Sequence, residues 1–266
     1  MKAPRVLVLR APGINCERET HFAFQRAGGA PEFVHVTQLL AKPDSLFDYR
    51  VLAVPGGFAY GDDIASGRVL AQELKARLGD RVLQFLDRGG LVLGICNGFQ
   101  VLVRLGLLPC TRGKLEEEVT LTHNLSNHYE CRWVTLQTQK SRCVFLPAGL
   151  TVRWPAAHGE GRLVPKDDGL ARVLLDEGFA ALRYVDASGA PAQHYPANPN
   201  GSPNAIAGLT DRTGRVLGMM PHPDRSFLPT HMPNWRETMR QQGTMPEDGD
   251  GMVVFREMVK VARADG

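Results

Sequence analysis

The chain has 266 residues, 43% of them apolar, which is enough for the core of one domain or of one domain with an appendage. Its 31 basic and 28 acidic residues are scattered and leave a formal net charge of +3, so the composition does not indicate nucleic-acid binding. No stretch approaches the roughly 18 apolar residues of a membrane span, and residues 1–10 lead into a strand without a signal-peptide pattern.

The first hundred residues alternate short apolar runs with helix-like segments. Strands are predicted at residues 5–9, 33–36, 49–54 and 91–95, and helices at 15–27 with Asn15 as the cap, 69–78, 81–88 and 99–105. This alternation predicts a central, mostly parallel sheet with helices on both faces. Ligands bind such sheets at the carboxyl ends of the strands, where Cys96, Gly57 and the Pro12-Gly13 loop are expected.

After residue 108 the pattern changes to short strands separated by polar turns. Strands are predicted at residues 119–121, 131–137, 151–154, 180–184, 205–209 and 216–220, several of them in a smaller antiparallel extension. We expect a single domain over residues 1–266, with 227–266 a C-terminal loop-and-helix appendage. Residues 227–251 read as surface loop, and residues 252–264 as an amphipathic helix that docks through Val253, Phe255, Met258 and Val259.

A cysteine stands between two glycines where the fourth predicted strand meets a helix. Gly94-Ile95-Cys96-Asn97-Gly98 has the form of a nucleophile elbow, in which glycines allow a sharp turn and the helix N-terminus favours a thiolate. The alternative is a buried structural cysteine beside ordinary turn glycines. The five cysteines are odd in number and lack C-x-x-C spacing, so we expect reduced thiols in the cytoplasm.

The candidate base is His222, which follows the strand predicted at residues 216–220 and therefore lies at a strand end like Cys96. Asp224 is two residues further on and can reach back to orient the imidazole. A metal-ligand pair or a surface histidine is the alternative. Zinc needs further ligands, and His123, His128 and His158 show no recognisable spacing, so no metal is expected.

These motifs resemble those of the class I, or triad, glutamine amidotransferases, and more narrowly those of the glutaminase subunits of phosphoribosylformylglycinamidine synthase. The resemblance runs from about residue 5 to 226. It is carried by RAPGINC at 10–16, PGGFAYGD at 55–62, GICNGFQ at 94–100, AHGEG at 157–161, NPNGS at 198–202 and PHPDR at 221–225.

The resemblance implies a flavodoxin-like fold and glutamine hydrolysis through a thioester on Cys96, with His222 as base and acid and Asp224 as its orienter. It places the oxyanion hole at the backbone N–H groups of Gly57 and Asn97. The residues that it implies for glutamine binding are Gly56, Phe58, Gln100, Gly159, Glu160 and Gly161.

The resemblance also implies a partner. The ammonia is passed to a synthetase subunit that uses ATP and Mg²⁺ to convert formylglycinamide ribonucleotide into formylglycinamidine ribonucleotide in de novo purine biosynthesis, with a small bridging subunit in some complexes. No cofactor is expected on this chain, which lacks a G-x-x-x-x-G-K-[ST] loop.

Two departures from the family pattern leave alternatives open. The family usually has Glu where this chain has Asp224, so the contact with His222 is direct after a loop shift, loosened or water-mediated. Residues 227–266 are more like the end of the glutaminase domain in the single-chain form of the enzyme, and one hypothesis is that they help to dock the synthetase. Two alternative functions remain open: the chain is a glutaminase subunit for a different synthetase, or it is a catalytically silent subunit needed only for assembly.

Overall fold

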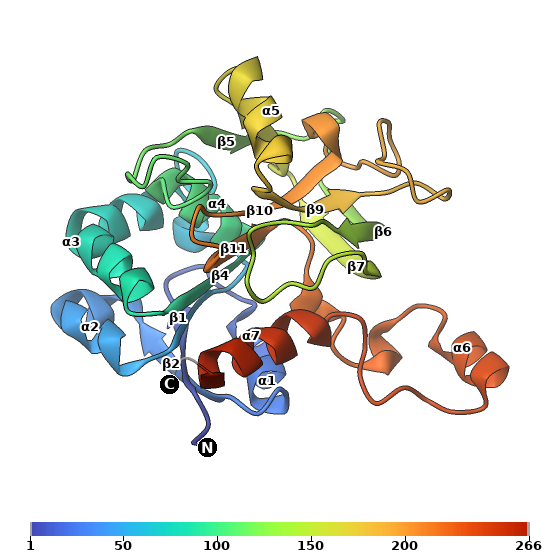
Figure 1. Cartoon of the computed structure of the whole chain (residues 1–266), viewed down its shortest axis with the longest axis horizontal. Helices are drawn as coiled ribbons and strands as arrows, with labels where there is room; N and C mark the ends of the chain where they lie inside the picture. Colours follow the sequence, from blue (N-terminus) through green and yellow to red (C-terminus); the bar gives the residue numbers. More distant parts are fainter. Residues whose placement is uncertain (1, 265–266) are drawn as a thin grey trace.

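The computed structural model describes residues 2–264 and is built around one nine-stranded sheet (Figure 1). The strand order is β2-β1-β3-β4-β11-β10-β9-β6-β7. The bounds of these strands are β1 Arg5–Arg10, β2 Ala30–His35, β3 Val51–Val54, β4 Leu91–Ile95, β6 Glu130–Thr138, β7 Thr151–His158, β9 Ala180–Tyr184, β10 Ile206–Thr210 and β11 Val216–Met219.

The sheet has a parallel half and an antiparallel half. The strands β2, β1, β3, β4 and β11 pair in parallel, whereas β10, β9, β6 and β7 continue from β11 in antiparallel pairs. A separate antiparallel pair joins β5 (Val119–Thr122) to β8 (Arg162–Pro165). The α/β fold predicted from the sequence is confirmed, and most of its antiparallel extension lies in the main sheet.

Helices cover both faces of the parallel half. In Figure 1, α1 (Glu17–Arg26) lies beside α7 (Met252–Ala264), while α3 (Arg68–Asp87) packs against α4 (Asn97–Leu105). The remaining helices are α2 (Val36–Ala41), α5 (Asp168–Asp176) and α6 (Trp235–Gln242). The strands between the helical layers are buried on both faces, which explains why β1, β3 and β4 are continuous apolar runs. Within residues 2–264, no helix is both long and apolar enough to cross a membrane.

Two predicted helix boundaries were wrong. The helices expected at 69–78 and 81–88 are one helix, α3, and Gly79 lies in the interior of that helix. The helix continues past this glycine because Leu78 and Val82 are both buried against the core. Their burial outweighs the roughly 1 kcal/mol that glycine costs in a helix. Asn15 does not cap α1: the helix begins after Cys16 and has no side-chain cap.

Three elements were missed, and the strand with the largest extension beyond its predicted bounds is β7. The helices α2 and α5 and the strand β8 lie in segments read as connections, although Asp167 caps α5 by accepting a hydrogen bond from Leu170 N–H at 2.7 Å. The strand β7 continues through Pro155 to His158, four residues beyond the predicted end. This extension carries Ala157 and His158 to the carboxyl end of the parallel strands.

The C-terminal segment has two parts that differ in structure. The helix α7 has the predicted bounds and is part of the core. Its Phe255 ring makes an edge-to-face contact with the ring of Phe24, with 5.0 Å between the ring centroids. All four predicted docking residues pack against the core, Val253 only partly buried, and the fully buried Val254 was missed. Residues 228–248 form an arm that projects from the body and contains α6, so this segment is not all loop (Figure 1).

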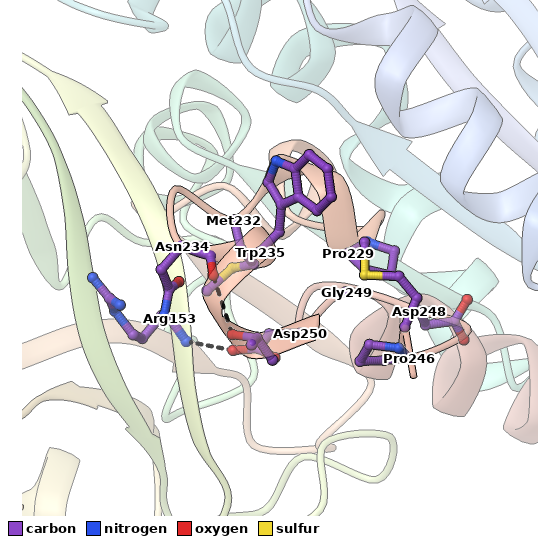
Figure 2. Close-up of a pocket in the computed structure, with 11 residues that line it drawn as sticks. Arg153, Pro229, Met232, Asn234, Trp235, Pro246, Asp248, Gly249 and Asp250 are labelled. Carbon is purple, nitrogen blue, oxygen red and sulfur yellow. Dashed lines mark hydrogen bonds between the residues drawn. The ribbon is translucent and has the colours of Figure 1, made fainter. Parts of the chain in front are cut away.

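A cavity of about 170 Å³ lies between the arm and β7 (Figure 2). Its lining includes Trp235, Met245 and Pro246 from the arm and Arg153 from β7. At the base of the arm, the backbone N–H of Arg153 donates to Asp250 Oδ2 at 3.0 Å.

Candidate active site

Cys96 lies at the turn between β4 and α4, as the elbow motif predicted. Its backbone has φ 52° and ψ −108°, a conformation that L-residues rarely adopt. The Cys96 N–H donates to Met219 O at 2.7 Å, which extends the pairing of β4 with β11 by one residue. The sheet and helix on either side therefore hold the cysteine in a strained turn, as is common at functional sites.

Both glycines of the motif are needed for this turn. A Cβ on Gly98 would overlap the carbonyl oxygen of Val54, and a Cβ on Gly94 would lie 2.8 Å from the oxygen of Gly98. The close approach of strand and helix thus excludes side chains at positions 94 and 98, two residues before and after Cys96.

His222 and Asp224 lie at the end of the neighbouring strand β11, and both are almost completely buried. The imidazole Nδ1 is 3.1 Å from Asp224 Oδ1, so the shorter carboxylate contacts the histidine directly. The chain forms a 3-10 turn at Pro223–Arg225, which brings the carboxylate back toward the ring. The backbone N–H of His222 donates to Pro155 O at 2.8 Å and fixes the ring position relative to β7.

The electrostatic environment favours a protonated His222. Burial lowers its pKa, but the Asp224 carboxylate and the Cys96 side chain raise it, and the net result is a pKa of about 9. The other ring nitrogen, Nε2, is buried and has no hydrogen-bond partner among residues 2–264. This nitrogen is therefore available to exchange a proton with a nearby thiol.

Gly56 brings the cysteine and the histidine together. A Cβ at this position would lie 2.9 Å from His222 Cε1 and 3.5 Å from Cys96 Cβ, so both side chains pack against the bare glycine. The Cys96 thiol also lies 3.6 Å from the carbonyl oxygen of Ala157 on β7. The structure thus places Cys96, His222 and Asp224 in one buried cluster.

Two backbone N–H groups beside this cluster have no acceptor among the described residues, those of Gly57 and Asn97. Asn97 is the first residue of α4, where an N–H has no intrahelical partner. Gly57 has φ 143°, and a Cβ there would lie 2.7 Å from Gly13 O and from Asn15 N. Glycine is therefore required where this loop crosses the cysteine site.

A cavity of about 220 Å³ opens beside Cys96. Of the residues predicted from the sequence, it is lined by Gly57, Phe58, Cys96, Gln100, Gly159 and Glu160. Gly56 and Gly161 lie behind the wall: Gly56 packs against the triad, and the Gly161 N–H donates to Asn124 Oδ1 at 3.1 Å. The prediction missed further lining residues, namely Asp62, Ser66, His123, Tyr129, Ala157 and His158.

The Gln100 side chain is already engaged within the protein. Its Nε2 donates to Glu160 O at 2.6 Å, and its Oε1 accepts from Asn97 Nδ2 at 2.9 Å. The same Asn97 amide donates to Asp62 Oδ1 at 3.0 Å and accepts from the Ala59 N–H at 3.0 Å. This network ties the loops before and after the cavity to the first turn of α4.

His158 is a second buried histidine at the cavity. Its Nδ1 lies 3.1 Å from Asn124 Oδ1, which also accepts from the Gly161 N–H, so Nδ1 is the protonated ring nitrogen. Burial, followed by the positive charge of His222, lowers the pKa of His158 to about 3. His158 is therefore neutral at physiological pH. The AHGEG motif contained this residue, but its role depends on Asn124, 34 positions away.

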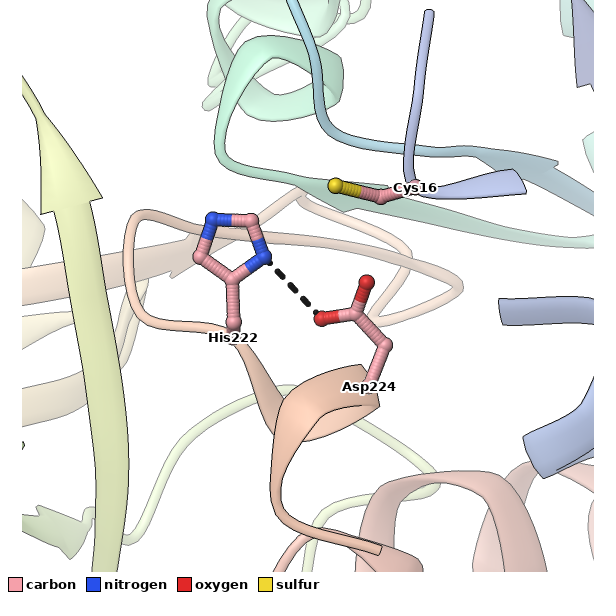
Figure 3. A group of neighbouring side chains, drawn as sticks. All are labelled: Cys16, His222 and Asp224. Atoms are coloured by element: carbon pink, nitrogen blue, oxygen red, sulfur yellow. Dashed lines mark hydrogen bonds and ion pairs between the residues drawn. The ribbon is translucent and has the colours of Figure 1, made fainter. Parts of the chain in front are cut away.

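The side chains of Cys16, His222 and Asp224 form a compact group that resembles a metal-ligand set (Figure 3). Their potential ligand atoms lie within 4.8 Å of one another. However, the Arg225 guanidinium donates to Cys16 Sγ at 2.9 Å and places a positive charge beside the group. That charge disfavours a bound cation, so the group is better described as the His222–Asp224 pair with Cys16 and Arg225 beside it.

The fold and the arrangement of Cys96, His222 and Asp224 define a class I glutamine amidotransferase. The family model described as a CobB/CobQ-like glutamine amidotransferase domain matches residues 3–261. The chain is 42% identical over 264 residues to phosphoribosylformylglycinamidine synthase subunit PurQ of Dehalococcoides mccartyi, with 99% of each chain covered. The corresponding subunit of Methanococcus maripaludis is 43% identical over 235 residues, with 88% of this chain and 86% of that one covered.

The chain belongs to the family of glutaminase subunits of phosphoribosylformylglycinamidine synthase. Its structure is also similar to a chain in the structure of PurLQS from Thermotoga maritima, with a TM-score of 0.70, 32% identity and coverage of 98% and 99% of the two chains. Because the D. mccartyi relative is a subunit matched over 99% of both lengths, a C-terminal segment of this kind is not confined to the single-chain enzyme.

Proposed function

We propose that Cys96, His222 and Asp224 carry out the glutamine hydrolysis that this family performs for its synthetase. The proposal rests on one observation: the elbow thiol and the Asp224-bound imidazole pack against the same glycine, Gly56. In this role Cys96 is the nucleophile, His222 is the general base and acid, and Asp224 orients the imidazole.

The reaction proceeds in two halves. With its proton held on the His222 imidazolium, the Cys96 thiolate attacks the side-chain amide carbon of glutamine. As the tetrahedral intermediate collapses, the carbon–nitrogen bond breaks, and His222 protonates the leaving nitrogen to release ammonia. Water then attacks the γ-glutamyl thioester while His222 takes one of its protons. Glutamate is released, and the Cys96 thiolate and the His222 imidazolium are regenerated.

Two features of the site favour the transition states. The N–H groups of Gly57 and Asn97 supply the oxyanion hole, and loss of one such donor costs about 3 to 4 kcal/mol. The Asp224 carboxylate stabilises the imidazolium that forms when Cys96 is deprotonated, consistent with the pKa of about 9 at His222.

The remaining cavity residues bind glutamine in this proposal. The backbone of Gly159 and Glu160, the Glu160 side chain and Phe58 face the amino-acid end of the substrate. Gly161 holds this loop in place through the hydrogen bond from its N–H to Asn124, and Gly56 leaves room for the triad. Gln100 has a more indirect role than the resemblance implied, because its hydrogen bond to Glu160 O positions that loop.

The ammonia is used by the synthetase subunit, which we propose binds ATP and Mg²⁺. Ammonia released to neutral water becomes ammonium and is no longer nucleophilic, so transfer within a complex is required. This chain has no phosphate-binding G-x-x-x-x-G-K-[ST] loop, in agreement with nucleotide binding on the partner. The free thiols at all five cysteines are typical of the reducing cytoplasm, where we place the protein.

The decisive experiment uses the Cys96→Ala variant assembled with its synthetase. We expect glutamine-dependent formation of formylglycinamidine ribonucleotide to be lost, whereas synthesis from added ammonium chloride continues. Loss of both activities would mean that the substitution damages the complex as a whole. Retention of glutamine-dependent activity would refute the role of Cys96.

A further inference from the structure

A second cysteine, Cys16, lies directly behind the triad, although the hydrolysis described above does not use it. It is fully buried between β1 and α1, and the hypothetical Cβ of Gly56 would lie 3.3 Å from its sulfur. The side chains of Cys16, Cys96 and His222 therefore all surround the space in which a Gly56 side chain would lie.

Asp224 has an oxygen whose environment requires explanation. Oδ1 contacts His222, but Oδ2 is buried and has no hydrogen-bond partner among the described residues. Figure 3 shows this second oxygen on the side of the carboxylate that faces Cys16. A buried carboxylate oxygen without a partner strongly attracts any nearby hydrogen-bond donor. For Asp224 to pair with His222 alone, other donors must be held away from Oδ2.

Arg225, the next residue in the chain, is a strong donor whose charge interacts with the Asp224 carboxylate. Its guanidinium is half-buried and donates to Cys16 Sγ at 2.9 Å. Burial and the neighbouring Asp224 carboxylate raise the pKa of Cys16 to about 12, so the sulfur is a neutral thiol. The thiol donates a hydrogen bond to Asn15 Oδ1, with 3.3 Å between sulfur and oxygen, and the same sulfur accepts a hydrogen bond from Arg225.

We propose that Cys16 is a positioning residue of the triad: its sulfur anchors the Arg225 guanidinium and closes the space behind Asp224, so that the carboxylate pairs with His222 alone. This inference rests on the proposed role of the triad. If the guanidinium moved onto Asp224 Oδ2, it would form an ion pair that competes with His222 for the same negative charge. The imidazolium formed during catalysis would then be less stable.

The test compares Cys16→Ala and Cys16→Ser in the full chain assembled with its synthetase. We expect Cys16→Ala to lower kcat for glutamine hydrolysis about tenfold with KM nearly unchanged, because the change acts on triad geometry and not on glutamine binding. Cys16→Ser keeps a small polar acceptor for Arg225 and should recover most of kcat. Cys143→Ala is the matched control, since Cys143 is also buried but neighbours the β10–β11 turn at the other end of the sheet.

Two further measurements separate positioning from general damage. NMR titration of labelled histidines should show a lower pKa for His222 in Cys16→Ala and no shift in Cys143→Ala. The titratable or charged groups around the cluster are Glu19, Asp224, Arg225 and Tyr129 near Cys16, and Cys96 and His158 near His222. In Cys16→Ala, the additional change Arg225→Gln should restore part of kcat, because it removes the competing cation.

The outcomes are distinguishable. Unchanged kcat in Cys16→Ala, or a lower kcat with an unshifted His222 titration and no rescue by serine, would overturn the positioning role. Either result with an inactive Cys96→Ala variant would leave the proposed triad intact. Glutaminase activity in Cys96→Ala would instead refute the triad itself.

Discussion

The Nδ1 atom of His222 and the Oδ1 atom of Asp224 lie 3.1 Å apart in a fully buried site, so an aspartate makes the direct contact for which the family usually uses a glutamate. The 3-10 turn at Pro223–Arg225 compensates for the missing methylene by folding the carboxylate back toward the ring. The looser and water-mediated alternatives left open by the sequence are therefore not what the structure contains.

Asp224→Ala should reduce kcat for glutamine hydrolysis by about 10⁴-fold, and less than Cys96→Ala does, because the nucleophile and the oxyanion donors remain. Without the carboxylate, burial dominates and the pKa of His222 falls from about 9. Steady-state glutamate release should show the loss in kcat, and histidine NMR should show the titration moving to lower pH. Asp224→Asn is the control, because it removes the charge of the side chain but keeps its shape and so leaves no cavity beside His222. A fully active Asp224→Ala variant would remove the orienting role.

Gly56→Ala should damage catalysis more than folding. Its backbone conformation is open to alanine, but the new Cβ would come within 2.9 Å of His222 Cε1 and push the ring away from Cys96. A displacement of this kind is expected to cost between about 10- and 100-fold in kcat. Kinetics and thermal unfolding should be measured on the same sample.

Gly149→Ala provides the comparison for Gly56→Ala. Gly149 has φ +81° with no neighbouring atom within 4 Å of the added Cβ, so the substitution strains the backbone by about 1 to 2 kcal/mol without touching the site. It should lower stability and leave kcat unchanged. If Gly56→Ala lowers stability in the same way and leaves kcat unchanged, the glycine does not position the histidine.

The cysteine turn at Cys96 was predictable because its signal is local. Strand, cysteine and flanking glycines occupy residues 91–98, and the turn needs only the close contact with Val54 to be complete. His222 was predictable for a related reason, since strand ends in a parallel sheet meet at one edge. Whether Asp224 touches His222 depends on a turn type that a proline-flanked tripeptide does not specify.

The residues that were missed are brought to the site by contacts between distant segments. His158 and Ala157 reach the site because β7 continues through Pro155 to residue 158. The carbonyl oxygen of Pro155 accepts a hydrogen bond from the His222 N–H, which joins β7 to the end of β11. In the sequence, Cys16 is only the last residue of the RAPGINC motif, and the Arg225 that it contacts lies 209 positions away. No periodicity or spacing in either segment indicates these pairings, because each depends on how the sheet is ordered.

The two buried histidines should give the unfolding free energy opposite pH dependences. The pKa of His158 falls from 6.5 to about 3 on folding, so its contribution is present above pH 6.5 and is lost as the pH falls toward 3. The pKa of His222 rises from 6.5 to about 9, so its contribution is present below pH 6.5 and is lost as the pH rises through 9.

His158→Gln should therefore flatten the acid side of the stability profile. Between pH 7 and pH 5 the wild type should lose about 2 kcal/mol through this group, and the variant should not. Urea unfolding at the two pH values measures the difference. His128→Gln, a change at an exposed histidine, should keep the wild-type dependence. A His158→Gln profile identical to that of the wild type would show that His158 is not neutral and buried in solution.

The C-terminal segment should separate into a structural part and a dispensable one. Deleting residues 226–266 removes α7 and exposes the surface against which Phe255 packs, which should cost several kcal/mol and prevent stable folding. Replacing residues 230–246 by a short glycine-serine linker should instead leave the melting temperature and the basal glutaminase activity close to wild type. The base of the arm can close because Gly249 N–H donates to Phe227 O at 2.9 Å and Gly251 N–H to Ser226 O at 2.8 Å.

The shortened chain then tests whether the arm helps to dock the synthetase. If it does, association measured by calorimetry or analytical ultracentrifugation should weaken at least about tenfold, with no change in glutamine hydrolysis by the isolated subunit. Because α7 is intact in this variant, weaker assembly cannot be attributed to an exposed core, as it could be in the full deletion. Equally tight assembly would assign residues 230–246 no part in the interface.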